Sequence, residues 1–201
     1  MKKINKPVIS KICVLLGAAL LFVGILVLVC WQWNINSSIQ KSKTYVEALN
    51  NLIPEPQGAI PEERRDNSMP VISIDGADFI GIIEIPKYKS ELPVGANWGH
   101  ITNYPCKFSG SVYDGTIQIG ATSQKGQYDF YREISVADTV IFTDVEGNRY
   151  TYEITNLRYE KHAEQTVLNQ EEAALTLFIK NVYDIEYLIV SCNILNYTAT
   201  A

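Results

Sequence analysis

Two cysteines and two histidines that follow a long apolar segment are the side chains best suited to nucleophilic catalysis. They are Cys106, Cys192, His100 and His162. A cysteine thiolate attacks a carbonyl carbon when a histidine accepts and returns the proton, which is the chemistry of cysteine proteases and transpeptidases. Cys192 ends a run of strand-type residues and is the stronger candidate, with Cys106 the second. Neither histidine is near Cys192 in the sequence, but catalytic pairs meet only in the fold.

The cysteines also allow two other interpretations. Cys13 and Cys30 lie within the apolar segment, where a small apolar side chain is the default role. Cys106 and Cys192 would reach an oxidising compartment and could form a disulfide, although two cysteines do not make a disulfide framework. A small side chain packed inside the fold is the simplest interpretation of each of them.

Motifs for other kinds of chemistry are missing from the sequence. It has no glycine-rich phosphate-binding loop, no His-x-x-x-His pair and no Cys-x-x-Cys pair. Residues 144–148 (DVEGN) carry oxygen ligands that could hold Ca²⁺, but their spacing is not that of an EF-hand loop. A hairpin turn explains this segment more simply. We therefore expect no cofactor, and calcium is the one ion left open.

An apolar run at residues 12–31 predicts a membrane anchor. It contains no charged residue over about 20 positions, the length that a helix needs to cross ~30 Å of hydrocarbon. Trp31 and Trp33 suit the membrane–water interface and no small-x-small cleavage site is present, so an uncleaved span at residues 12–33 is favoured over a signal peptide. Four lysines lie within residues 1–11, without any acidic residue. This asymmetry predicts a cytoplasmic N-terminus and an extracytoplasmic C-terminal domain at the cell membrane.

The charge of the chain after the span argues against nucleic acid as a partner. Removing the four N-terminal lysines from the 17 basic residues leaves 13 against 22 acidic residues, a net charge of about −9. Phosphate backbones require clustered lysine and arginine, and a soluble acidic surface accounts for this composition. In the whole chain 47% of residues are apolar and 19% are charged, which indicates a folded domain rather than a disordered chain.

Residues 34–70 are predicted to form a juxtamembrane helix and a proline-rich tether. Residues 36–52 are polar with a weak apolar stripe, which is typical of an exposed helix. Prolines and a glycine within residues 54–61 end this helix, and the charged residues 62–68 continue as an exposed segment. We therefore expect this region to act as a spacer between the membrane and the domain at residues 71–201.

The domain contains short strand-type runs that are separated by turn residues. They lie at residues 79–85, 116–119, 139–143, 149–157, 175–179 and 187–192. The runs at 139–143 and 149–157 flank the DVEGN turn and alternate with period two, which predicts a β-hairpin. The run at 175–179 could instead belong to a helix capped by residues 169–172. Regularly spaced short strands predict an all-β fold, either a closed barrel or a sandwich.

Several of these runs, in this order, resemble the sortase family. Residues 80–86 (IGIIEIP) and 92–94 (LPV) are similar to the family's G-x-I-x-I-P and L-P-V segments. Residues 104–113 (YPCKFSGSVY) resemble a segment of a clostridial-type subgroup. The resemblance covers residues 79–195, and it implies an all-β, sortase-like, eight-stranded closed β-barrel with short helices.

Three further segments stand where the family carries its catalytic residues. They are residues 119–122 (IGAT) for I-A-G-H, 175–180 (LTLFIK) for L-T-L-F-T-C and 186–190 (EYLIV) for S-R-V-T-V. In the family, the cysteine thiolate attacks a backbone carbonyl of a sorting signal, the histidine protonates the leaving amine and the arginine stabilises the oxyanion. A surface amine then resolves the thioester.

Carried over by position, all three catalytic residues of the family are replaced. Thr122 stands for the histidine (Ala121 if the alignment shifts by one), Lys180 for the cysteine and Tyr187 for the arginine. Neither threonine nor alanine can shuttle a proton near neutral pH. An ordinary lysine is protonated there and would form a stable amide, and tyrosine brings no positive charge.

Two hypotheses follow from this resemblance. The first is a catalytically inactive sortase-like module on the outer face of a Gram-positive membrane, which binds a sorting-signal-like peptide, a pilin or another sortase. The second is an active cysteine transpeptidase that attaches surface proteins to the cell wall or pili with a relocated nucleophile, Cys192. Against the second, no Arg, Lys or His follows Cys192 to supply the expected cation. A purely structural role in an envelope complex is not separable from the first hypothesis by sequence.

Overall fold

The computed structural model describes residues 6–54, 68–161 and 173–198 of the 201-residue chain. The chain divides into two compact units, Met1–Ser38 and Ile39–Ala201. Three features expected from the sequence fall outside the described residues. They are the tether over residues 55–67, the side chain of His162 and the helix cap at residues 169–172.

The first unit is the N-terminal part of a long helix, α1 (Lys6–Leu52). Within Val14–Leu52 this helix contains a stretch long and apolar enough to cross a membrane. Its apolar side chains, such as Leu20 and Phe22, are exposed, as they are on a helix that faces lipid. A helix satisfies its own backbone polar groups, so an uncharged apolar run is stable in hydrocarbon in this form. The predicted span is therefore helical, and its orientation stays a prediction.

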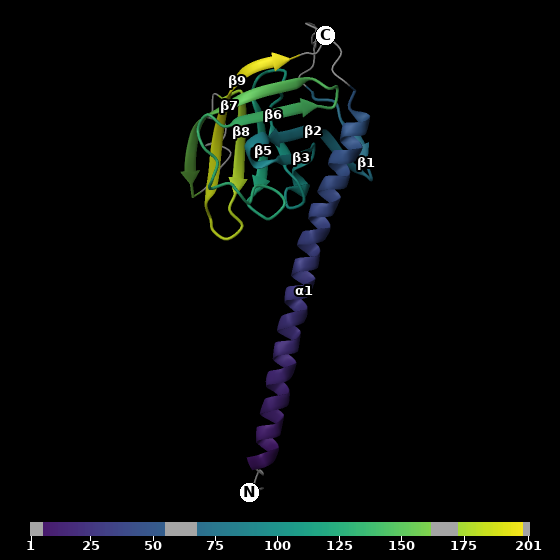
Figure 1. Cartoon of the computed structure of the whole chain (residues 1–201), viewed down its shortest axis with the longest axis vertical. Coiled ribbons are helices and arrows are strands. Elements are labelled where there is room, and N and C mark those ends of the chain that lie inside the picture. The colour runs from purple at the N-terminus through teal and green to yellow at the C-terminus, as the bar shows by residue number, and fades with distance from the viewer. Residues whose placement is uncertain (1–5, 55–67, 162–172, 199–201) are drawn as a thin grey trace. The chain divides into compact units, whose positions relative to one another are not determined.

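The second unit is built from nine β-strands (Figure 1). They are β1 (Ile72–Ile74), β2 (Ala77–Ile85), β3 (Ser90–Gly95), β4 (Cys106–Ser109), β5 (Ile117–Thr122), β6 (Thr139–Asp144), β7 (Arg149–Glu160), β8 (Leu175–Lys180) and β9 (Tyr187–Thr198). Two short 3-10 helices, η1 (Pro86–Tyr88) and η2 (Trp98–His100), follow β2 and β3. Every run predicted as a strand is one, and the helical alternative for residues 175–179 is wrong because this run forms β8.

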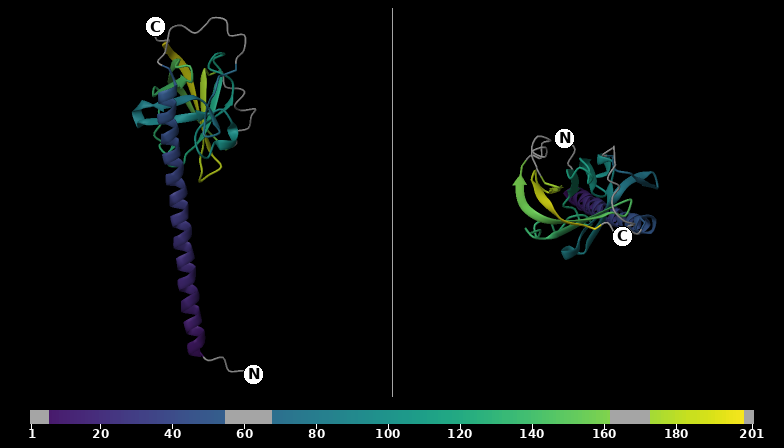
Figure 2. Two further views of the ribbon diagram at one scale, coloured as in Figure 1. Left: turned by 90° about the vertical axis from the view of Figure 1, so that its right-hand side faces the viewer. Right: turned by 90° about the horizontal axis from the view of Figure 1, so that it is seen from above.

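The strands close into a barrel. Neighbouring strands pair in the order β1-β2-β3-β4-β5-β8-β9-β7-β6, and β6 pairs back with β2. Strands β2 to β9 thus form a closed eight-stranded barrel, while β1 pairs with the beginning of β2. The long strands β7 and β9 lie side by side and curve together (Figure 2). The closed eight-stranded barrel with short helices that the sequence implies is confirmed.

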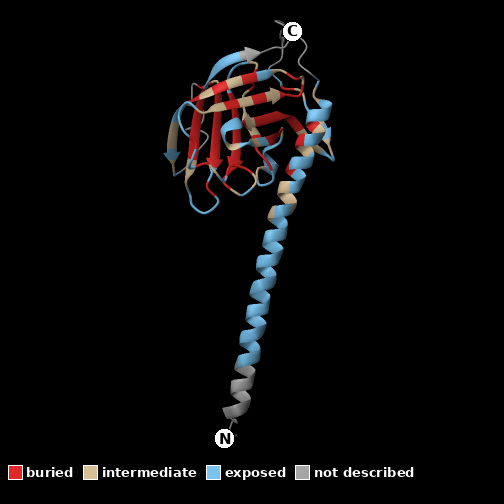
Figure 3. Ribbon diagram, in the orientation of Figure 1, coloured by how far each residue is buried: buried red, intermediate tan, exposed pale blue. Residues whose placement is uncertain are grey.

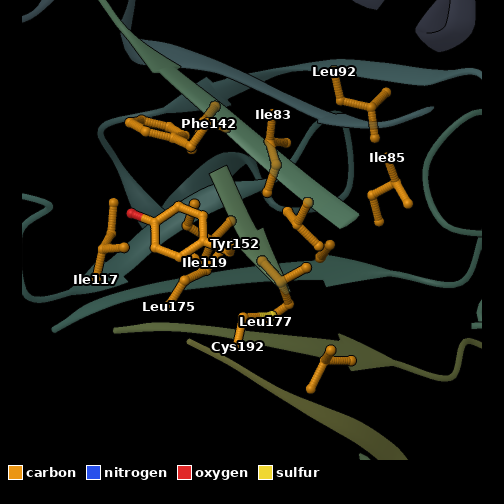
Figure 4. Packing of buried hydrophobic residues seen from close by; sticks show 14 of the residues in the cluster. Ile83, Ile85, Leu92, Ile117, Ile119, Phe142, Tyr152, Leu175, Leu177 and Cys192 are labelled. Atoms are coloured by element: carbon orange, nitrogen blue, oxygen red, sulfur yellow. The ribbon is translucent and has the colours of Figure 1, made fainter. Parts of the chain in front are cut away.

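Alternate side chains of the strands fill the barrel interior. In β6 the burial alternates strictly, with Val140 and Phe142 buried, as the period of two requires. Buried residues are concentrated in the strands (Figure 3), and side chains such as Ile119, Phe142 and Tyr152 pack together inside (Figure 4). Burying one such side chain contributes about 1.5–3 kcal/mol, so this interior is the main source of the barrel's stability.

The last turns of α1, from Ile39 onward, belong to the second unit and pack on the outside of the barrel. Ser42, Val46 and Leu49 are buried at spacings of four and three residues, which places them on one face of the helix. Val46 and Leu49 share a cluster with four residues of the strand region: Phe79, Ile82, Tyr104 and Cys106. The structure therefore differs from the expectation that residues 34–70 act only as a spacer, because the weak stripe of the helix is a packing face.

Candidate functional site

Thr122, Lys180 and Tyr187, which we call the site row, lie side by side at the ends of three neighbouring strands. Thr122 of β5 is opposite Lys180 of β8, and Lys180 is opposite Tyr187 of β9. Figure 1 shows these strands next to one another. Adjacent strands are about 4.8 Å apart, so the row spans roughly 10 Å. The fold therefore brings together the three positions at which the resemblance places catalytic groups.

The site row faces outward from the barrel. Side chains alternate between the two faces of a strand, and Ala121 and Ile179 belong to the interior cluster. Their neighbours Thr122 and Lys180 accordingly point to the outer face. Lys180 is exposed, Tyr187 is half-buried and Thr122 is 3% exposed. A ligand would therefore meet Lys180 and Tyr187 first, with Thr122 behind them.

Hydrogen bonds fix the backbone around Thr122. Its N–H donates to Oε1 of Gln127 at 3.0 Å, and Nε2 of Gln127 donates to the carbonyl of Ile101 at 3.0 Å. One buried carboxamide thus ties the end of β5 to the loop that follows η2. The N–H of Ser123 donates to the carbonyl of Lys180 at 2.9 Å, which holds the ends of β5 and β8 together.

None of the three side chains can perform the step expected at its position. The Thr122 hydroxyl does not titrate near neutral pH and has no hydrogen-bond partner within the described part of the chain. The Lys180 amine has no free lone pair while it is protonated, and the Tyr187 phenol donates a hydrogen bond without bringing positive charge. The row can bind polar or anionic groups, but acyl transfer requires other side chains.

Cys192 lies inside the barrel, opposite Leu175 and Ile154 in the register. It has no exposed surface, and Figure 4 shows it among Leu175 and Leu177 in the interior cluster. Burial raises the pKa of its thiol to about 12. At pH 7 about one thiol in 10⁵ would then be ionised. This environment argues against Cys192 as a relocated nucleophile and favours its interpretation as a small interior side chain.

Cys106 is sealed on the outer side of the sheet. It packs with Val46 and Leu49 of α1 and has no exposed surface. Its Sγ donates to the carbonyl of Tyr104 at 3.4 Å, and burial raises the pKa of the thiol to about 12. His100 is exposed, and its ring lies 6.0 Å from the ring of Tyr104. The imidazole of His100 therefore faces solvent while the Cys106 thiol is enclosed, and this arrangement does not suit a catalytic pair.

Both cysteines are free thiols, so the disulfide considered from the sequence is wrong. Strands β5 and β8 separate β4, which carries Cys106, from β9, which carries Cys192. One side chain belongs to the interior cluster and the other to the cluster beneath α1. A disulfide needs Cα atoms within about 7 Å and Cβ atoms that face each other, which these positions do not provide.

Residues 144–148 form the turn of the β6–β7 hairpin. The buried Asp144 carboxylate accepts hydrogen bonds from the N–H groups of Glu146 and Asn148 at 3.0 and 2.9 Å, and from Nδ2 of Asn148 at 2.9 Å. It therefore caps the turn, which is the simpler of its two predicted roles. In residues 6–54, 68–161 and 173–198, no group of three His, Cys, Asp or Glu side chains could hold a metal ion. Calcium, the one ion that the sequence leaves open, is neither supported nor contradicted by this turn.

An aromatic cluster that the sequence analysis missed lies beside the site row. Trp98 of η2 packs on Phe108 and Phe178, with ring centroids 5.1 and 5.4 Å apart. The indole also covers Gly120, where a Cβ would lie 2.4 Å from two of its carbons. Gly120 and Phe178 are opposite each other, two residues along the strands from the row. The one sequence signal for this contact was Gly120 itself, because it stands where the family motif has alanine and leaves room for the indole.

The turn between β8 and β9 exposes apolar side chains on the other side of the row. Val182, Tyr183 and Ile185 are 43%, 82% and 70% exposed. The turn is nevertheless held in place, because the N–H of Val182 donates to Oγ of Ser123 at 3.1 Å. Large apolar side chains exposed together are typical of a binding surface.

The same strand arrangement occurs in solved structures, although no family model and no curated protein matches the sequence. Sortase C-3 from Streptococcus pneumoniae matches with a TM-score of 0.53 and 16% identity, over 82% of this chain and 86% of that chain. Sortase A from Corynebacterium diphtheriae matches with a TM-score of 0.51 and 16% identity, over 83% of this chain and 86% of that chain. Sortase A from Listeria monocytogenes matches with a TM-score of 0.51 and 17% identity, over 61% of this chain and 91% of that chain. The domain has the sortase fold.

These structural matches confirm the barrel architecture that the sequence resemblance implies. Identities of 16–17% show the fold alone, so the clostridial-type subgroup and the loss of activity stay predictions. The aromatic cluster, the site row and the β8–β9 turn follow one another in this order at the ends of β5 and β8. They form one continuous candidate site on the outer face.

Proposed function

We propose that the chain is a membrane-anchored, sortase-fold protein that binds an extended polypeptide at the site row and does not catalyse transpeptidation. The observation that carries this proposal is the row itself. The three positions lie side by side in register, and they hold threonine, lysine and tyrosine in place of histidine, cysteine and arginine. The strands that carry these positions pair regularly, so the histidine, cysteine and arginine are replaced within an intact barrel.

The proposed lack of catalysis rests on the state of both thiols in the domain. A nucleophilic thiol must be accessible and ionisable. Cys192 is enclosed in the barrel and Cys106 lies beneath α1, and burial raises the pKa of each to about 12. Removing one member of a catalytic triad typically costs about 10⁴–10⁶ in kcat. With all three positions replaced, binding is the function that the row can still perform.

A polypeptide ligand is supported by the side chains on either side of the row. Trp98, which is 40% exposed, covers the part of β5 and β8 that precedes the row. The apolar β8–β9 turn follows the row. Between these two apolar surfaces Lys180 offers an ammonium group to carbonyl or carboxylate oxygens. An extended segment with apolar side chains matches this order. We therefore propose a sorting-signal-like peptide as ligand, either free or as part of a pilin or another sortase.

The proposed location is the outer face of a Gram-positive cell membrane. It is supported by the candidate span in α1 and by the four lysines that precede it without any acidic residue. A cytoplasmic N-terminus would leave the sortase-fold domain on the side where sorting signals and pilins are found.

The test incubates the full chain, embedded in lipid nanodiscs, with fluorescently labelled sorting-signal-like peptides and an amine acceptor. Anisotropy should show saturable binding, and mass spectrometry should find neither a cleaved peptide nor an acyl adduct on any cysteine. Lys180→Glu should weaken binding about tenfold, whereas Lys41→Glu, an equal charge change on the exposed side of α1, should not. A cleaved product that is formed by the parent and not by Cys192→Ala would show that the protein is catalytically active and would overturn this part of the proposal. If none of the peptides binds, the proposal that the ligand is a sorting-signal-like peptide is wrong.

A further inference from the structure

A cavity away from the site row lies between the last turns of α1 and the barrel. Its volume is about 320 Å³, which is large enough for the polar headgroup of a lipid or a similar small molecule. Its lining comes from three segments: residues 39–43 of α1, residues 88–92 around the start of β3, and residues 125–130 in the loop after β5. No residue of the site row contributes to it.

Three lysines line this cavity, one from each segment. Lys43, Lys89 and Lys125 are exposed, and in the described part of the chain none of them forms an ion pair. Lys87, two residues before Lys89, is by contrast paired with Asp138 at 2.8 Å. The chain after the span has 13 basic residues against 22 acidic ones, so three unpaired ammonium groups around one cavity depart from its general charge. Such a concentration favours an anionic ligand.

The helical wall of the cavity carries a buried hydroxyl group. Ser42 lines the cavity and is 3% exposed, and among the described residues its Oγ forms no hydrogen bond. A buried hydroxyl without a partner is destabilising. The Oγ atom is closed to water in the ligand-free chain, so the side chain must change rotamer to donate to a ligand oxygen, which would then remove that cost. Ser42 is therefore a second feature of the same cavity that indicates an acceptor-rich ligand.

Two carboxylates also line the cavity, and they limit its positive charge. Oε1 of Glu91 accepts a hydrogen bond from Nδ2 of Asn50 at 2.8 Å. Asn50 lies about two helical turns beyond Ser42, so Glu91 is engaged away from the serine. Asp129 is the other carboxylate of the lining. Three ammonium groups against two carboxylates leave a small positive charge, which favours an anion over a cation.

A glycine holds the loop wall of the cavity against the helix. Gly126 has a φ of +87°, and a Cβ at this position would lie 2.3 Å from Cγ1 of Ile39. Glycine permits both this backbone conformation and the close approach to α1. The loop that carries Lys125 is thereby fixed next to the helix that carries Lys43. A site whose groups are already in position loses less entropy when a ligand binds.

We propose that this cavity binds a phosphate-bearing anion, either the headgroup of an anionic lipid or a soluble phosphate ester. A phosphate group offers more acceptor oxygens than a carboxylate, which suits three ammonium groups and one hydroxyl. Lysine binds such a group as a point charge and needs no planar geometry. Lipid headgroups are a ready source, because the chain contains a candidate membrane span and Lys43 follows Trp33 by ten residues.

The test uses the full chain and two probes that separate the sources. Phosphatidylglycerol is mixed into phosphatidylcholine nanodiscs, and native mass spectrometry of the released protein counts the lipids of each kind that it retains. Glycerol phosphate is added to the protein in pure phosphatidylcholine nanodiscs and its binding is measured by calorimetry. Retention of phosphatidylglycerol alone would assign the site to a headgroup with its acyl chains. Binding of both probes would assign it to the phosphate ester itself.

Matched variants decide whether the cavity is responsible. Lys43→Gln with Lys125→Gln should weaken binding of the successful probe about tenfold or more, since two charge-assisted contacts are lost. Lys41→Gln with Lys161→Gln removes the same charge from exposed positions outside the cavity and should change binding less than twofold. Ser42→Ala should weaken it severalfold without altering the net charge. Equal losses in both lysine pairs, or no binding of either probe, would overturn the proposal.

Discussion

The inner and outer faces of β5, β8 and β9 share one backbone but have opposite characters. On the inner face Ile119, Leu177 and Cys192 pack into the continuous apolar interior. On the outer face the same strands end in Thr122, Lys180 and Tyr187, of which two remain accessible. The inner face determines the barrel, because it supplies the buried apolar area. Catalysis needs only a few groups on the outer face, so the sortase fold can persist after they have changed.

The largest difference between the barrel interior and its outer surface should appear in stability. Phe142 has no exposed surface, and Phe142→Ala should lower the free energy of unfolding by about 3–5 kcal/mol because it leaves a cavity in the barrel. Tyr183 of the β8–β9 turn is 82% exposed, and Tyr183→Ala should change it by no more than about 0.5 kcal/mol. Urea unfolding followed by near-UV circular dichroism measures both. Similar losses would show that the outer turn also supports the fold.

The second difference concerns pH. Burial raises the pKa of the Cys192 thiol from an ordinary value of 9.0 to about 12. Below pH 9 the folded and unfolded states both keep this proton. Between the two pKa values only the folded state keeps it, so stability should fall as the pH rises, by about 1.4 kcal/mol per pH unit for this group.

Comparison with Cys192→Ala isolates this thiol from the other buried ionisable groups. The variant should lose less stability than the parent between pH 9 and 11 in urea unfolding. In parallel, Cys192 should react with a thiol reagent at pH 8 only on unfolding, whereas the exposed Cys30 can react in the folded protein, so labelling is assigned to each cysteine by peptide mass spectrometry. Identical pH profiles, or rapid labelling of Cys192 in the folded protein, would show that the interior thiol is accessible.

The third difference tests the contact between Trp98 and Gly120. Gly120→Ala places a Cβ 2.4 Å from the indole, so the ring must move outward and lose packing on Phe178, at a cost of about 1–2 kcal/mol. Trp98 is the only tryptophan after Trp33, so a Trp31→Phe, Trp33→Phe background isolates its fluorescence. We expect a red-shifted emission and stronger quenching by acrylamide. Unchanged emission would mean that the indole does not lie on this strand.

Much of the barrel was predictable, because its signals are local in the sequence. The alternation around Val140 and Tyr152 predicts strands whose inner residues are buried, and the structure confirms it. The order of the motifs predicts that Thr122, Lys180 and Tyr187 occupy related places, and pairing between β5, β8 and β9 brings them together.

The features that were missed depend on contacts between distant segments. Nothing near Trp98 in the sequence indicates that its ring packs on Phe178, because only the pairing of β4, β5 and β8 creates that surface. The stripe with Val46 and Leu49 was too short to distinguish a packing face from an exposed helix. The cavity near Lys125 required both this helix and the close approach that Gly126 permits.

The smallest expected effect separates two threonines with similar burial. Thr122 and Thr176 are 3% and 1% exposed, and neither Oγ1 has a hydrogen-bond partner among the described residues. Substituting valine removes an unpaired buried hydroxyl while keeping the shape of the side chain. Thr122→Val and Thr176→Val should therefore each leave the free energy of unfolding unchanged or raise it by up to about 1 kcal/mol.

The two variants should differ in binding, because only Thr122 belongs to the site row. If a bound peptide displaces the groups that cover the Thr122 hydroxyl, Thr122→Val should weaken anisotropy-measured binding about two- to fivefold through loss of one neutral hydrogen bond. Thr176→Val should leave binding unchanged. Equal binding by both variants would remove Thr122 from the site and confine ligand contacts to Lys180, Tyr187 and the apolar surfaces beside them.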